Sequence, residues 1–143
     1  MSDLSRFLKA NKIVRENTTY PATTSLTDEE GNPLLWTIKP VTTRENDKLR
    51  DDCTIQVQVT GKPNLTKPEL QTSKFLAKMI AASVVEPNLN NKELQDSYGV
   101  MSPEELVKEM IDNPGEYNNF AKFIQDFNGF TETLEEKVEK AKN

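Results

Sequence analysis

The acidic residues and the single cysteine are the side chains whose types could support chemistry in this sequence. Adjacent acidic residues that could be proposed as an acid and a base include Glu29 with Glu30, Asp51 with Asp52, and Glu104 with Glu105. Two carboxyl groups can act as the acid and the base of a hydrolysis, but neighbouring acids at turns and helix starts more often form solvated faces. Cys53 has no histidine to activate its thiol, so we expect a small packed side chain at the end of a surface helix.

The residue types that are missing exclude most kinds of active site. There is no histidine, which rules out histidine-based acid-base catalysis, histidine-activated nucleophiles and histidine metal ligands. A single cysteine cannot form a thiolate zinc cluster or an intrachain disulfide. The five glycines are too far apart for the glycine-rich loops that hold nucleotide phosphates. We therefore predict no catalytic residue, no cofactor and no metal, in a protein that is not an enzyme.

Length and charge limit the class of protein further. A chain of 143 residues suits one domain with its own core and leaves no room for a second full domain. The net charge of −5 disfavours binding to nucleic acid or to an anionic membrane, and the basic cluster of Lys9, Lys12 and Arg15 has no interleaved aromatic residues. The longest apolar run, residues 79–85, is far shorter than the roughly 20 residues of a membrane span, and the N-terminus has no signal-peptide pattern. We expect a cytoplasmic protein.

The first part of the chain predicts a short helix and a hairpin. Leu4, Phe7 and Leu8 have the spacing of an amphipathic N-terminal helix, which we expect to dock on the body. Residues 18–26 and 34–40 have strand character, and the stretch between them is rich in turn residues. The sequence therefore predicts a β-hairpin here.

The next part predicts a surface helix and a third strand. Thr42 and Glu45 have the spacing of a capping box, and few apolar residues follow them. Residues 54–60 alternate apolar and polar side chains, which is typical of a half-buried strand. We expect this strand to join the hairpin.

The rest of the chain predicts helices. We expect these helices at residues 66–85, 90–98, 102–111 and 113–128, from their cap residues, first-turn prolines and apolar stripes. The first of them is the candidate for the central helix. We expect an α+β fold that is mostly α-helical, with a small antiparallel hairpin or three-stranded sheet followed by a bundle of four or five helices. One domain would cover residues 1–130, with its β-rich part in residues 1–60 and its helical part in residues 64–130.

The C-terminal part carries candidate partner-binding residues. In the last of these helices, aromatic side chains cover more of the helix surface than one buried face requires. They are Tyr117, Phe120, Phe123 and Phe127, and Phe130 follows them. These side chains either fill the core or form a partner surface. Residues 131–143 carry only a narrow apolar stripe that includes Leu134 and Val138, too thin to hold a helix on a core. We expect this amphipathic segment to be mobile until a partner binds it.

Four stretches together resemble a known family. They are "LSRFLKANK", "GNPLLWTIKPVTTRENDKLRDDCT", "EPNLNNKELQDSYGVMSPEELVKEMI" and "PGEYNNFAKFIQDFNGF". They are similar to the XkdN-like tail assembly chaperones of phages and prophages with contractile tails, and the likeness covers residues 4–130. Residues 94–99, "LQDSYG", and residues 114–117, "PGEY", are its most specific parts. The family brings no catalytic motif to transfer.

The resemblance implies a non-enzymatic role in the bacterial host cytoplasm. Such chaperones coat the tape measure protein, keep its hydrophobic helices soluble and recruit tail tube subunits, and self-association is compatible with the same apolar stripes. The corner at residues 98–102 would then shape a groove for a client helix, with Leu94 and Tyr98 on one wall, unless these two are simple packing residues. Two other classes stay open: a permanent structural subunit of the tail, and an acidic phage-encoded inhibitor, which the interspersed lysines disfavour.

Overall fold

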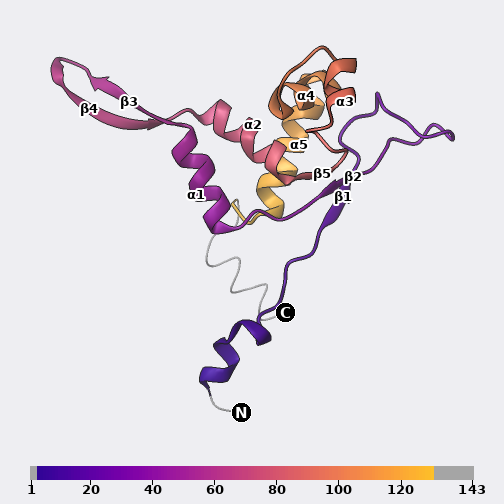
Figure 1. Cartoon of the computed structure of the whole chain (residues 1–143), viewed down its shortest axis with the longest axis horizontal. Helices are drawn as coiled ribbons and strands as arrows, with labels where there is room; N and C mark the ends of the chain where they lie inside the picture. Colours follow the sequence, from indigo (N-terminus) through magenta and orange to yellow (C-terminus); the bar gives the residue numbers. More distant parts are fainter. Residues whose placement is uncertain (1–2, 131–143) are drawn as a thin grey trace.

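The computed structural model describes residues 3–130, which form an α+β fold dominated by helices (Figure 1). In chain order the elements are the 3-10 helices η1 (Leu4–Phe7) and η2 (Lys9–Asn11), then β1 (Thr18–Tyr20), β2 (Trp36–Ile38), α1 (Thr43–Asp52), β3 (Thr54–Val59), β4 (Lys62–Leu70), α2 (Thr72–Ser83), β5 (Val84–Glu86), α3 (Lys92–Ser97), α4 (Pro103–Met110) and α5 (Pro114–Phe127). The predicted fold class is confirmed.

A three-stranded antiparallel sheet has β2 at its centre. Strand β1 pairs with β2, with Tyr20 opposite Trp36, which confirms the predicted hairpin. Strand β5 pairs with the other edge of β2, with Val84 opposite Ile38. Because side chains alternate along a strand, Trp36 and Ile38 are buried while Thr37 between them is not. The third strand is therefore β5, and the prediction that residues 54–60 would join this sheet is wrong.

Residues 54–70 form a separate two-stranded hairpin. Strands β3 and β4 pair antiparallel from Thr54 opposite Leu70 onwards, and the hairpin projects away from the helices (Figure 1). The predicted helix start at Thr66 is therefore wrong, because Thr66 and Glu69 both lie in β4, where they pair with Gln58 and Ile55 of β3. Helix α2 begins at Thr72, just before its apolar stripe.

Helix α2 is the centre of the helical part. It packs against α1, α4 and α5, and its residues Met79 and Ile80 are buried. The other helices begin at side-chain caps that accept a hydrogen bond from the backbone N–H three residues later, and these caps are Thr42, Asn91, Ser102 and Asn113. Such caps satisfy N–H groups that have no partner inside a helix, which explains why these starts were predictable.

Most of the buried apolar residues form one cluster between the sheet and the helices. It contains Ala22, Trp36, Ile38, Met79, Ile80, Val84, Leu89, Leu106, Val107, Met110, Ile111, Phe120, Ala121 and Ile124. Cys53 is buried at the C-terminal end of α1, as predicted. At the N-terminus Phe7 is 86% exposed in η1, so the predicted docking of an N-terminal helix on the body is wrong.

Candidate partner-binding site

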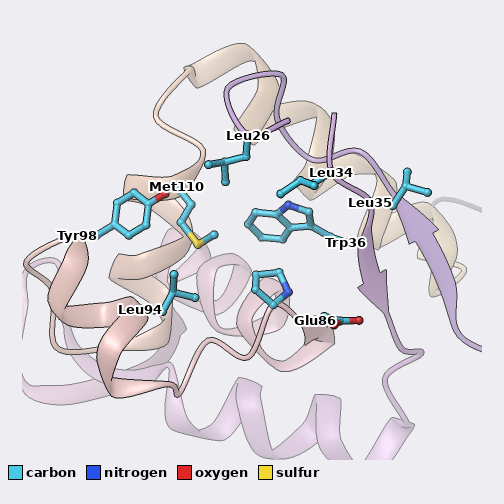
Figure 2. A pocket seen from close by; sticks show the side chains of 9 residues that line it. Leu26, Leu34, Leu35, Trp36, Glu86, Leu94, Tyr98 and Met110 are labelled. Atoms are coloured by element: carbon cyan, nitrogen blue, oxygen red, sulfur yellow. The ribbon is translucent and has the colours of Figure 1, made fainter. Parts of the chain in front are cut away.

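An apolar hollow of about 460 Å³ opens on the surface between the sheet and helices α3 and α4 (Figure 2). Its lining residues are Leu26, Leu34, Leu35, Trp36, Glu86, Pro87, Leu94, Tyr98 and Met110. They come from stretches of chain that are far apart in sequence. The hollow therefore forms only when the sheet and the helices have packed together.

One wall of the hollow comes from α3. Leu94 and Tyr98 are four residues apart, so they lie on one face of the helix and its C-terminal cap. The side-chain amide of Gln95 donates a hydrogen bond to the carbonyl of the buried Leu89 at 2.8 Å, which ties the helix to the core. Gly99 then takes a φ of 68°, a left-handed conformation that ends helices readily. The local sequence thus fixes both the face and the length of α3.

The opposite wall comes from the loop between β1 and β2. The backbone N–H of Leu34 donates to the carbonyl of Leu26 at 2.9 Å, which brings the two ends of this loop together. Figure 2 shows Leu26 and Leu34 above the indole of Trp36, with Met110 between the indole and Tyr98. Trp36 is only 2% exposed. The buried indole therefore forms a fixed aromatic floor to the hollow.

The chemistry of the hollow suits binding of apolar side chains. Glu86 is the one charged residue among the nine that line it, and no lining residue is a histidine or a cysteine. Leu35 at the rim is 62% exposed and Leu34 is also exposed. Pockets of this size, with apolar walls and few polar groups, hold small ligands or the anchor side chains of a peptide helix. Neighbouring exposed apolar residues commonly mark a binding surface.

A hydrogen-bond network near the surface holds the loop that forms this wall. The carboxylate of Glu116, in the first turn of α5, accepts from the Thr23 hydroxyl at 2.8 Å and from both the backbone N–H and the hydroxyl of Thr24 at 2.9 Å. The bonds from Thr24 and Thr23 lower the pKa of Glu116, because they stabilise its charged form. Leu26 lies two residues after the anchored Thr24, so the bonds to Glu116 of α5 help to position the hollow.

Comparison with known proteins identifies the family. A sequence profile described as "Phage XkdN-like tail assembly chaperone protein, TAC" matches residues 4–142, which is nearly the whole chain. This chain belongs to the XkdN-like tail assembly chaperone family. The resemblance found in the sequence is confirmed.

Two Bacillus subtilis (strain 168) proteins are similar over nearly the full length of the chaperone. The phage-like element PBSX protein XkdN is 30% identical over 99% of this chain and 94% of its own. Protein YqbN is 33% identical over 99% of this chain and 93% of its own. A crystal structure of YqbN superposes with a TM-score of 0.73 at 28% identity, covering 90% of this chain and 98% of that one. Across residues 3–130 of the chaperone, no helix has both the length and the apolar character needed to span a membrane.

The structure brings two of the predicted partner-binding residues together. Leu94 and Tyr98 share a wall of the hollow. The sequence did not predict that Leu34 and Trp36 would line the same hollow. The run "LLW" at residues 34–36 nevertheless indicated that one of its apolar side chains would be left exposed. Since alternate side chains of a strand point to opposite faces, three consecutive large apolar residues cannot all be buried on one face of a half-covered sheet.

The aromatic stripe of α5 packs mostly within the chain. Phe120 is fully buried against Trp36, with ring centroids 5.6 Å apart. The ring centroid of Phe123 lies 4.2 Å from that of Tyr20, with the two rings stacked, and 6.0 Å from that of Phe127. Tyr20 of strand β1 therefore covers an aromatic side chain that lies beside the buried face of α5. Tyr117 is half-buried, and this burial raises the pKa of its hydroxyl. These contacts do not require a partner.

Phe130 lies beside a second, smaller hollow. It is 51% exposed and lines a space of about 220 Å³ together with Phe75 and Leu76 of α2. The remaining predicted partner-binding residues, Leu134 and Val138, lie outside the described residues.

Proposed function

We propose that this chain is a non-enzymatic tail assembly chaperone that binds the tape measure protein through the hollow between α3 and the loop of residues 26–35. The observation that supports this is an open apolar hollow with an exposed rim on a member of a tail assembly chaperone family. In the same proposal the chaperone helps to recruit tail tube subunits and acts in the cytoplasm of the bacterial host.

The hollow has the form of a site for an amphipathic helix. Leu94 and Tyr98 provide one apolar wall and Leu34 provides the other, so a client helix would insert side chains at positions i and i+4 between them. The indole of Trp36 forms the floor against which the tips of such side chains would pack. The tape measure protein, as a long chain with apolar helical faces, would offer such side chains repeatedly.

The charge of the chaperone fits the same role. Its net charge of −5 would keep a complex with an apolar client in solution, because like-charged complexes repel one another. Near the hollow, Glu86 lies at the sheet side, where it would favour client helices that carry lysine or arginine beside their apolar face.

Co-expression with the tape measure protein tests the proposal. The double variant Leu94→Ala and Tyr98→Ala should reduce the amount of tape measure protein that co-purifies and stays soluble, while the circular dichroism spectrum remains that of the parent chain. Leu65→Ala is the matched control, since Leu65 is also an exposed apolar residue but lies on the distant β4. Equal recovery of the client with the double variant and the control would reject the hollow as the binding site.

The alternative role of a permanent tail subunit predicts a different distribution. A chaperone leaves the assembly, so mass spectrometry of purified tails should show none of this chain beside the tube and tape measure proteins. Its presence in fixed ratio to the tube subunit would favour the structural role.

A further inference from the structure

The hairpin of β3 and β4 projects from the body with both long edges unpaired among the described residues. Its two strands pair only with each other, and their side chains are exposed or half-buried (Figure 1). An isolated two-stranded hairpin is marginally stable in water, and an unpaired edge offers backbone groups to another strand. The chemistry of the two edges decides which of them can accept one.

The backbone hydrogen bonds show which groups face outward. The N–H of Gln71 donates to the carbonyl of Cys53 at 2.8 Å, just outside the paired segment. In an antiparallel ladder, residue pairs that exchange backbone hydrogen bonds alternate with pairs that do not. Because Cys53 and Gln71 are hydrogen-bonded, the next pair, Thr54 with Leu70, is not, and neither is Gln56 with Pro68. The N–H and carbonyl groups of Thr54, Gln56 and Gln58 therefore point away from β4 to the free edge of β3.

The two edges are protected very differently. Pro68 stands at a position whose nitrogen faces the free edge of β4, where it has no N–H to offer, and β4 also contains Lys62, Lys67 and Glu69. Prolines and charged residues are the usual protection against pairing at a sheet edge. Strand β3, "TIQVQV", contains neither. Of the two edges of this hairpin, the β3 edge is therefore the one that is open to another strand.

The sequence of β3 is nearly symmetric about Val57. Gln56 and Gln58 flank Val57 on its two sides, and the apolar residues Ile55 and Val59 come next. Two copies aligned antiparallel about a twofold axis at Val57 would place Gln56 of one copy opposite Gln58 of the other, and these are the residues whose backbone groups face outward. We propose that β3 is a self-association surface, on which two copies of this chain pair edge to edge into a four-stranded sheet.

Charges at the ends of the strand fit this antiparallel alignment. Asp51 and Asp52 end α1 just before β3, separated from it by Cys53, and Lys62 follows the turn after the strand. In the antiparallel pair the acidic end of each copy lies beside the basic end of the other, whereas a parallel pair would place like charges together. The contact covers one short strand on each copy, so it is at the small, reversible end of protein interfaces.

A proline substitution tests the free edge without breaking the hairpin. Gln56→Pro removes an outward N–H that β4 does not use, and Thr66→Pro makes the same change on the outer edge of β4, opposite Gln58. Sedimentation of the full chain across micromolar to millimolar concentrations should show a reversible dimer for the parent and for Thr66→Pro. Gln56→Pro should dimerise at least about tenfold more weakly, as expected when one or two intermolecular hydrogen bonds are lost.

A cysteine pair tests the register independently. Val57→Cys would place two thiols opposite each other in a non-bonded pair with Cα atoms about 4.5 Å apart, within the range of disulfides. Ile55→Cys is the control, because in the proposed register its two copies are offset by four residues, roughly 13 Å. Mild oxidation should therefore link Val57→Cys into dimers and leave Ile55→Cys largely unlinked. The native Cys53 is buried and should not contribute.

Three results would overturn the proposal: a parent chain that remains monomeric at every concentration, a dimer that Gln56→Pro leaves unchanged, or equal cross-linking of the two cysteine variants. A monomeric chain whose hairpin instead captures a strand of a tail protein would also overturn it. These outcomes are separate from the client-binding hollow, because Leu94→Ala with Tyr98→Ala should leave the dimer intact.

Discussion

Replacing Phe120 with alanine tests whether the aromatic stripe of α5 belongs to the core. The side chain is fully buried, and its ring lies 5.6 Å from the rings of both Tyr20 and Trp36. Removing a buried phenylalanine ring leaves a cavity and lowers the free energy of unfolding by about 3–5 kcal/mol. The two aromatic contacts account for roughly 1–3 kcal/mol of that loss. Because domains are usually stable by only about 5–15 kcal/mol, the variant should be severely destabilised.

Phe130→Ala is the matched control from the same predicted set. Its side chain is 51% exposed, so truncation removes about half of the burial energy of a phenylalanine, on the order of 1 kcal/mol. Urea unfolding followed by circular dichroism gives both free energies, and the dependence on urea should be unchanged. If Phe120→Ala were no less stable than Phe130→Ala, the burial of this face of α5 would be refuted, and Phe120 would again be a candidate for contact with the client.

Glu116, Gly99 and Cys53 provide three further tests. The pKa of Glu116 is lowered in the folded chain, so the stability that its charged form adds is present above the ordinary pKa of 4.5 and is lost as the pH falls through the folded pKa. The urea midpoint should therefore fall less steeply with decreasing pH for Glu116→Gln than for the parent chain. An equally steep fall in both would contradict the role of the bonds to Thr24 and Thr23. Gly99→Ala should lower the free energy of unfolding by about 1 kcal/mol, because alanine is strained at a φ of 68°; an unchanged melting temperature would count against the left-handed end of α3. The thiol of Cys53 should react slowly with a thiol reagent in the native chain and rapidly in urea, so fast native reaction would show that it is not buried.

Helix starts were predictable because each depends on a few neighbouring residues. The caps at Thr42, Ser102 and Asn113 bond to N–H groups three residues away, and no distant part of the chain is needed to specify them. The same local spacing at Thr66 and Glu69 gave a false helix start. There, pairing with β3 satisfies the backbone instead, and Pro68 is tolerated because its nitrogen faces the free edge.

The candidate site was half predictable for the same reason. Leu94 and Tyr98 are neighbours on one helix face by spacing alone, so the sequence could place them together. Their opposing wall, with Leu34 and the floor at Trp36, belongs to a hairpin that meets α3 only after the sheet packs on the helices. Nothing in the local pattern of either stretch specifies the other.

The sequence by itself determined the absence of histidine chemistry, the family and most helix boundaries, because these follow from residue types and from interactions within one helical turn. The tertiary structure decided that Val84 to Glu86 complete the sheet, that β3 and β4 stand apart as a hairpin, and that Tyr20 covers Phe123. Each of these joins segments distant in the chain, and many such pairings satisfy the same local patterns. Only the packing of the whole core selects one of them.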